Sequence, residues 1–170
     1  LGAQMSHTLA CAIALLATTT ALGGDLTVGP GDLALVLGKT PTPAEKRAGE
    51  LFAERAQERS GVAFADPGGK GTVRLVIGTA ASNDLIREFA KTHEQVAALG
   101  ADGYCISADA GTRVIHVAGQ SDSGVVAGVG RLMRELRYRD GSLEVPSLLV
   151  AETPAMPNRG IYLWARKYYF

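Results

Sequence analysis

The first third of the chain combines a short apolar run with a longer amphipathic segment. The apolar run at residues 32–39 predicts a strand or the entry to one. Beyond it, Thr42 and Pro43 close a cluster of breaking residues, and Glu45 stands three positions after Thr42. Threonine at the cap, proline at the first helical position and glutamate at the third form a capping box. We therefore predict a helix that begins at Pro43 and ends just before Gly61.

The middle of the chain continues with an uninterrupted apolar run. Residues 72–79 are Thr-Val-Arg-Leu-Val-Ile-Gly-Thr, which is typical of a strand covered on both faces of a sheet. Either Ser82 or Asn83 is suited to cap a second helix, which we expect to end near Gly100. The buried stripe of this helix is expected to consist of Leu85, Ile86, Phe89 and Ala90.

Two further apolar segments predict a hairpin. The strands are expected at residues 104–108 and 113–118, and the turn at 109–112 contains Gly111, which is able to take a positive φ. Cys105 has no partner cysteine in the expected domain, and its flanking residues suggest a small buried side chain in the first of these strands.

The last regular elements are a third helix and a final strand. Ser121 or Asp122 is expected to cap the helix, which continues to about Arg137, and residues 148–150 predict the strand. The order of elements is therefore β-α-β-α-β-β-α-β. This order predicts the α/β (α+β) class, with a small mixed sheet and helices packed on it.

Composition and charge restrict the class of protein. The chain has 170 residues, of which 46% are hydrophobic and 20% charged, and its formal net charge is zero. A nucleic-acid binder needs a positive excess to neutralise phosphates, and a protein held at a membrane surface by basic residues needs one too. We therefore expect no nucleic-acid partner and no membrane contact beyond the N-terminal segment.

The N-terminal segment has the pattern of a signal peptide. Residues 9–16 are apolar throughout, and Ala21-Leu22-Gly23 supplies the small residues that a signal peptidase reads. Met5 is a plausible true start, although no lysine or arginine precedes the apolar run. We expect a signal peptide at 1–23 and a secreted or periplasmic protein. A short membrane anchor is the alternative reading.

Glycines and histidines predict neither a cofactor nor a metal site. Gly124, Gly128 and Gly130 lie inside the predicted third helix rather than at its start, and no glycine follows Gly130 where a dinucleotide-binding loop would need its last one. We therefore expect these glycines to allow close packing of the helix on the sheet. The two histidines beyond the signal segment, His93 and His116, have no His or Cys at ligand spacing. We expect His116 to be paired or to face solvent.

We expect no pair of catalytic carboxylates in this chain. Glycosidase chemistry needs two carboxyl groups that face each other across the scissile bond. Asp102, Asp109 and Asp122 stand at predicted turns or caps, so we assign them structural roles and expect no catalytic residue in this chain.

The end of the chain is rich in aromatic residues. Residues 159–164 (Arg-Gly-Ile-Tyr-Leu-Trp) predict a new strand, and Tyr168, Tyr169 and Phe170 follow it. An exposed cluster of this kind invites association. We expect a domain over 24–157 and, at 158–170, the start of a further domain that would bury these rings.

Taken in order, the motifs of the second half resemble those of a known domain. The sequence is similar to the small α/β domain that precedes the barrel in family 20 β-hexosaminidases and in α-glucuronidases. The resemblance covers roughly residues 30 to 164 and rests on Gly103-Tyr104-Cys105-Ile106, Val114 to Gly119, Ser123 to Val129 with Leu132 and Leu136, Pro154, and Arg159-Gly160.

The resemblance implies a role and a partner. In those enzymes the domain does no chemistry and packs against a (β/α)₈ barrel, whose first strand begins at the Arg-Gly pair. The catalytic acid pair would then lie beyond Phe170, and Arg159 would be the one substrate-binding residue, on hydroxyls of the sugar. Where those hexosaminidases usually place an aspartate, this chain has Trp164. The resemblance therefore leaves open whether the parent enzyme is β-N-acetylhexosaminidase-like or α-glucuronidase-like.

Two other classes of function stay open at this point. A stand-alone carbohydrate-binding or interaction module would present exposed aromatic rings, whereas Phe52 and Phe89 are expected on buried helix faces. A small α/β enzyme unrelated to glycosidases would need polar groups that converge in a cleft.

Overall fold

The computed structural model describes residues 24–65 and 71–155. Most of these residues form one five-stranded sheet with helices on both faces. The strands of this sheet are β2 (Leu33–Val36), β3 (Val73–Thr79), β4 (Tyr104–Asp109), β5 (Val114–Gly119) and β8 (Leu148–Glu152). The helices in the described ranges are α1 (Pro43–Ser60), α2 (Asp84–Thr92), α3 (Glu94–Ala97) and α4 (Asp122–Glu135).

The five-stranded sheet is mixed. Its order is β2-β3-β5-β4-β8, in which β2, β3 and β5 run parallel and β4 and β8 join by antiparallel pairing. Because the strands of the parallel part are joined through helices, α1, α2 and α4 all begin at the edge where β2, β3 and β5 end.

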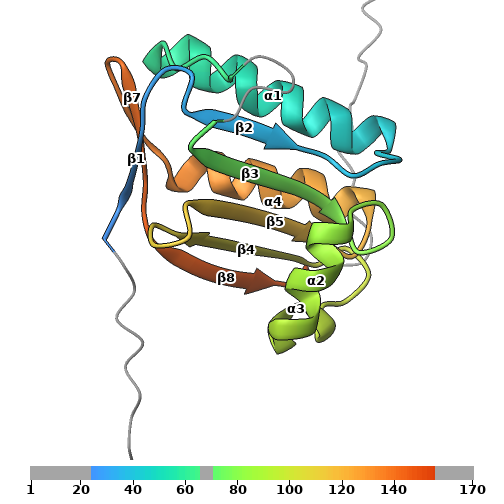
Figure 1. Cartoon of the computed structure of the whole chain (residues 1–170). Helices are drawn as coiled ribbons and strands as arrows, with labels where there is room; N and C mark the ends of the chain where they lie inside the picture. The colour runs from blue at the N-terminus through green and yellow to red at the C-terminus, as the bar shows by residue number, and fades with distance from the viewer. Residues whose placement is uncertain (1–23, 66–70, 156–170) are drawn as a thin grey trace, which may run out of the picture.

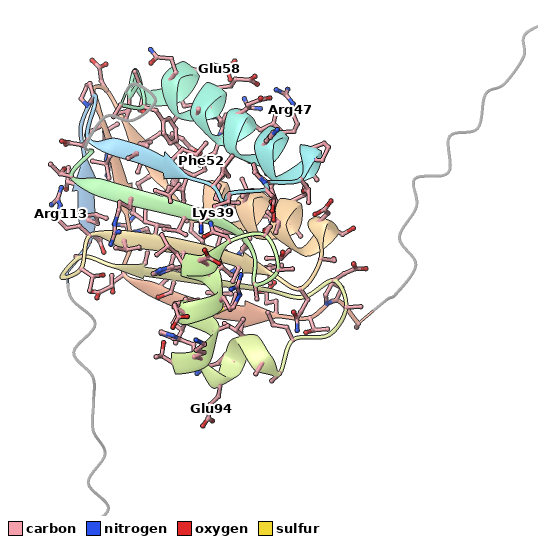
Figure 2. The ribbon with its side chains drawn as sticks, turned by 45° about the vertical axis from the view of Figure 1, so that its right-hand side comes forward. Lys39, Arg47, Phe52, Glu58, Glu94 and Arg113 are labelled. Atoms are coloured by element: carbon pink, nitrogen blue, oxygen red, sulfur yellow. The ribbon has the colours of Figure 1, made fainter. Side chains whose placement is uncertain are left out.

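One face of the sheet is covered by the two long helices. Phe52 of α1, together with Val125, Val129 and Leu132 of α4, packs on inward-facing strand residues such as Ile115. Figure 2 shows Phe52 pointing from α1 into the protein, while Arg47 and Glu58 point outward. Helix α1 therefore has one buried face and one exposed face, as an amphipathic helix does.

The opposite face carries the shorter helices. Ile86 and Phe89 of α2 and Val96 of α3 pack on Val76, Cys105 and Ala118 of the sheet in a second apolar cluster. Figure 1 shows α2 and α3 crossing in front of the sheet at one end of the strands, with α4 behind it. The helix cover on this face is therefore partial.

The predicted class and element order are confirmed. All eight predicted elements are present, and the helix predicted from the capping box begins at Pro43 and is stopped by Gly61 in the left-handed conformation. Both halves of the capping box are formed, since Thr42 Oγ1 accepts from the Glu45 amide and Glu45 accepts from the Thr42 amide. Cys105 is fully buried, and burial raises the pKa of its thiol to about 11.

The second predicted helix is wrong in length. It breaks at His93 into α2 and α3, because the Thr92 hydroxyl donates to the Phe89 carbonyl oxygen and His93 Nδ1 lies 3.0 Å from the same atom. These side chains take the carbonyl that the helix would need to continue. Leu85, predicted to be buried, is 40% exposed.

The hairpin turn also differs from its prediction. The residue with positive φ is Arg113 (φ 55°) rather than Gly111. Asp109 accepts from the Gly111 amide at 2.9 Å, and the Arg113 side chain is held by the carbonyl and hydroxyl oxygens of Thr72 at 3.1 and 2.9 Å. These contacts hold Arg113 in a left-handed backbone conformation that residues other than glycine usually avoid.

A small second sheet was not predicted. It contains β1 (Leu26–Val28), β6 (Arg137–Arg139) and β7 (Ser142–Val145) in the order β1-β7-β6. Its apolar side chains join the core between α1 and the main sheet. The third helix accordingly ends at Glu135, and Arg137 starts a strand.

The predictions for residues 1–23 and 158–170 lie outside the described residues, as do the last two residues of the predicted 24–157 domain. In the described ranges, no helix is both long enough and apolar enough to cross a membrane.

Candidate functional site

The carboxyl edge of β2, β3 and β5 is the first place to look for a site, because open α/β sheets bind ligands there. Here a buried glutamate occupies it. Glu45 is fully buried and accepts hydrogen bonds from the Thr42 amide (2.8 Å), the Thr79 amide (3.0 Å) and the Ser82 hydroxyl. Glu45 thus joins the start of α1 to the end of β3 and the turn before α2.

The other helix starts at this edge are also closed by the protein's own side chains. Ser121 caps α4 and donates from its hydroxyl to Asp102 at 2.9 Å, while the Thr42 hydroxyl donates to Asp122 at 2.9 Å. At the start of α2, Lys39 lies 3.3 Å from Asp84, and its hydrogen bond, with the charge of Arg87, lowers the pKa of that carboxyl. The side chains of Asn83 and Ser121 therefore cap α2 and α4 at the positions where an anionic ligand would otherwise bind.

The three aspartates expected at turns or caps lie at or next to such positions. Asp102 binds the cap of α4, Asp109 holds the hairpin turn, and Asp122 links α4 to Thr42 of α1. Each therefore engages a different hydrogen-bonding partner.

The two histidines lie on either side of one aromatic ring. Phe89 stacks on His93 at 4.0 Å and on His116 at 4.3 Å between ring centroids. Burial, with the nearby charges of His93 and Arg74, lowers the pKa of His116 to about 4. Within the described residues, no three His, Cys, Asp or Glu side chains are grouped as metal ligands.

Two of the helical glycines have the predicted packing role. A Cβ on Gly124 would lie 2.4 Å from the Gly103 carbonyl oxygen, and one on Gly128 would lie 2.8 Å from Cγ1 of Val117. Gly130 differs, because its nearest neighbour would be the end of Arg134 at 3.9 Å. Gly130 therefore does not pack on the sheet but opens onto the surface.

The surface at Gly130 is a groove that runs beside α4 and is also lined by residues of β4 and β8. The sequence analysis did not predict this groove. Its volume is about 810 Å³, and a neighbouring hollow of about 400 Å³ continues it toward the start of α1. The groove is lined by Tyr104, Val126, Ala127, Gly130, Arg134, Glu152, Thr153, Pro154 and Ala155. The hollow is lined by Ala44, Asp122, Ser123, Val126 and Ala127. We call the two together the α4 groove.

Apolar and charged groups meet in the α4 groove. Val126 is 46% exposed and lines both the groove and the neighbouring hollow. At the other side, the Tyr104 hydroxyl donates to Glu152, which also lies 3.3 Å from Arg131. Burial and the Glu152 contact raise the pKa of Tyr104 to about 12. These features fit a protein interface better than a catalytic centre.

Part of this groove could have been found from the sequence. Small residues recur at Ser123, Ala127 and Gly130, which indicates a shallow helix face. The position of Glu152 across the groove depends on the pairing of β8 with β4 and has no local signal. Arg159, the one predicted substrate-binding residue, lies outside the described residues.

Comparisons with known proteins give a match in fold only. No family model matches the sequence, and neither does any curated protein. A family GH115 4-O-methyl-α-glucuronidase with specificity for decorated arabinogalactans matches with a TM-score of 0.60 at 13% identity, over 77% of this chain. The chitobiase of Flavobacterium johnsoniae matches with a TM-score of 0.57 at 14% identity, over 83%. The N-acetyl-β-hexosaminidase of Streptomyces plicatus gives 0.54 at 15% identity, over 79%.

This chain shares its fold with part of each of these glycoside hydrolases. It covers only 19%, 20% and 24% of their respective lengths. The resemblance drawn from the sequence motifs is thereby confirmed for the fold.

Proposed function

We propose that this chain is a non-catalytic domain of a secreted glycoside hydrolase and that it packs against the catalytic barrel of the same protein. The observation that carries the proposal is the coverage of the fold match, about four-fifths of this chain but at most a quarter of each hydrolase. The activity of the parent enzyme would be hydrolysis of glycosidic bonds, of the β-N-acetylhexosaminidase or α-glucuronidase kind.

The α4 groove supports a docking role. Thr153, Pro154 and Ala155, the last described residues, line it. A following barrel would therefore be tethered beside an open, partly apolar surface, which favours an intramolecular contact. In this proposal Arg159 begins the first barrel strand and binds sugar hydroxyls there.

The carboxyl edge of the sheet supports a non-catalytic role. Glu45 has three hydrogen-bond donors and is shielded from solvent, so it is not placed to exchange protons with a substrate. Asp102, Asp109 and Asp122 are each held by a different part of the chain. Chemistry would then come from the barrel.

The aromatic side chains argue against a stand-alone sugar-binding module. Among the described residues, Phe52, Phe89 and Tyr104 are buried, and Phe64 and Tyr138 are half-buried. A flat exposed ring on which a sugar would stack is therefore lacking in this part of the chain. The proposed location is extracytoplasmic, and it rests on the signal-peptide pattern of residues 1–23.

A paired substitution tests the docking surface in the full-length protein. Val126→Asp places a carboxylate in the α4 groove, and Leu149→Asp places one at a similarly exposed position, 44%, on the opposite face of the sheet. We expect Val126→Asp to separate the unfolding of this domain from that of the barrel in calorimetry, because a buried unpaired charge is strongly unfavourable. Leu149→Asp should leave one joint transition.

Two results would overturn the docking proposal: equal effects of the two variants, or independent unfolding of the domains in the unmodified protein. Assays of the 170-residue chain on aryl glycosides test the non-catalytic role separately. We expect no turnover. Hydrolysis that survives purification and disappears on substitution of Asp102, Asp109 or Asp122 would contradict that role.

A further inference from the structure

The face of the sheet opposite the α4 groove contains a separate cleft, between α2 and strands β3 and β5. Its volume is about 380 Å³, which lies within the range of small-molecule sites. It is lined by Arg74, Val76, Leu85, Glu88, Phe89, Thr92, His93, Val114 and His116. We call it the α2 cleft. Its lining comes from α2, the start of α3, and strands β3 and β5, and Figure 1 shows that α2 and α3 cross this face only at one end of the strands.

The inner wall of the α2 cleft is apolar and fixed. Val76, Phe89 and Val114 are buried and belong to the apolar cluster on this face. Phe89 is clamped between the rings of His93 and His116, and its plane is within 10° of that of His116. A ligand therefore meets a preformed surface, with little ordering of side chains to oppose binding.

Two polar groups on neighbouring strands face this cleft without an internal partner. Arg74 forms no ion pair, and His116 no side-chain hydrogen bond, with any residue in the described ranges. Arg74 pairs with Val114 and Val76 with His116 in the β3–β5 register, so Arg74 and His116 are diagonal neighbours. Because burial lowers the pKa of His116 to about 4, its ring is neutral at pH 7 and offers one N–H donor and one acceptor.

The remaining polar groups of the cleft are already engaged. Glu88 lies 2.7 Å from Lys91, and the Thr92 hydroxyl donates to the Phe89 carbonyl oxygen. His93 uses Nδ1 in contacts with Thr92 and Phe89. The groups left to recognise a ligand are thus the guanidinium of Arg74, the neutral imidazole of His116 and Nε2 of His93.

We propose that the α2 cleft binds a small carboxylic acid whose carboxylate pairs with Arg74 and His116 and whose compact apolar body lies against Leu85, Val114 and the edge of the Phe89 ring. A guanidinium presents two parallel N–H groups that match the two oxygens of a carboxylate. A single cation beside an apolar wall suits one negative charge on an apolar body. A hydroxyl-rich ligand would find few hydrogen-bonding partners on that wall.

The cover of the sheet supports the same inference. β2, β3 and β5 are the parallel part of this mixed sheet, and all-parallel sheets in other proteins are almost always covered on both faces. Here α2 covers only part of one face. A bound apolar group would extend that cover and remove Leu85, 40% exposed, from water.

Nuclear magnetic resonance titration of the ¹⁵N-labelled 170-residue chain at pH 7 tests the proposal, with benzoate as the probe and benzamide as its uncharged counterpart. We expect saturable shifts at the amides of Arg74, Val114 and His116 with benzoate, and binding at least about tenfold weaker with benzamide. Glucuronate, a carboxylate on a hydroxyl-rich ring, is expected to bind more weakly than benzoate.

Matched arginine variants complete the test. Arg74→Ala should weaken benzoate binding about tenfold or more, whereas Arg47→Ala should leave it unchanged, because Arg47 lies on the outer side of α1 and is paired with Glu50 and Glu54 (Figure 2). Both arginines are exposed, so neither substitution should impair folding. The proposal is overturned if benzoate gives no saturable shifts, if benzamide or glucuronate binds as tightly, or if the two variants behave alike.

Discussion

The two faces of the five-stranded sheet are built in different ways. On one face, α1 and α4 are fixed by close contacts, namely those of the buried Glu45 and of Gly128, which lies directly on β4 and β5. On the other, α2 is attached mainly through Ile86 and Phe89 and leaves His116 half-buried at the rim of a cleft.

This difference indicates where the protein tolerates change. Where a helix lies directly on the strands, any added or missing atom is transmitted to its neighbours, whereas a partly covered face has room to adjust. Substitutions under α1 and α4 should therefore affect stability more than those under α2. Glu45→Ala and Gly128→Leu test this expectation, and two further measurements concern His116 and the cap of α1.

The largest effect is expected for Glu45→Ala. The substitution leaves the Thr42 and Thr79 amides without their buried acceptor, which should lower the free energy of unfolding by about 3 kcal/mol. Urea denaturation measures the change. The control is Glu58→Ala, since Glu58 is exposed on the same helix and should contribute less than about 1 kcal/mol. Similar losses for both variants would mean that the buried carboxylate does not hold this edge together.

Gly128→Leu should follow. Because a Cβ at Gly128 already meets Val117 at 2.8 Å and Cβ of Tyr104 at 3.2 Å, a leucine overpacks the contact at a cost of roughly 1–3 kcal/mol. Gly130→Leu is the matched control, two residues further along the helix, where a Cβ meets only Arg134 at 3.9 Å. Thermal melting should separate the two. A Gly128→Leu protein as stable as the Gly130→Leu protein would show that α4 does not approach the sheet closely.

On the other face, an effect of intermediate size should appear as a dependence on pH. His116 has its folded pKa lowered to about 4, below its ordinary value, so above pH 6.5 it is neutral in both states. As the pH falls from 6.5 to 4, the unfolded state takes up a proton that the folded state does not, and roughly 1–2 kcal/mol of stability is lost.

The measurement compares the unfolding free energy of the wild-type protein with that of His116→Gln at several pH values, since the difference cancels the titration of the carboxylates. The gap between the two proteins should shift in favour of the variant as the solution becomes acidic. A gap that stays constant from pH 7 to pH 4 would place His116 in a solvated position.

Thr42→Ala should have the smallest effect. It removes the cap of α1 and the hydroxyl that donates to Asp122, at a cost of about 1 kcal/mol. Thr40→Ala is a suitable control, because Thr40 is exposed and precedes the helix. An unchanged denaturation midpoint for Thr42→Ala would show that α1 does not depend on this cap.

Local signals account for the elements that were predicted well. The capping box at Thr42 and the stop at Gly61 act within one turn of the helix, so they are visible in the sequence. The small sheet was missed although Asp140-Gly141 is a two-residue hairpin signal between β6 and β7, with Gly141 at φ 74°. Its strands are too short for their alternation of apolar and polar residues to stand out.

Other features depend on distant parts of the chain. Ser82 and Asn83 were equally good caps by sequence, and Asn83 caps α2 because its amide also donates to the Ile77 carbonyl oxygen at 3.0 Å, while Ser82 is directed to Glu45. The α4 groove has only a partial local signal, the small residues of its helix face, and the α2 cleft has none, because each is completed by strands that the local sequence does not place.

The sequence by itself determined the class, the order of eight elements and the ends of the first helix, because propensity, capping and hydrophobic period act over a few residues. Only the tertiary structure decided that Glu45 closes the carboxyl edge and that Gly128 packs inward while Gly130 opens the α4 groove. It also decided that Arg74 and His116 share a cleft. These outcomes depend on which strands pair and how closely a helix approaches them, and both are set by burial across the whole fold rather than by neighbours in the chain.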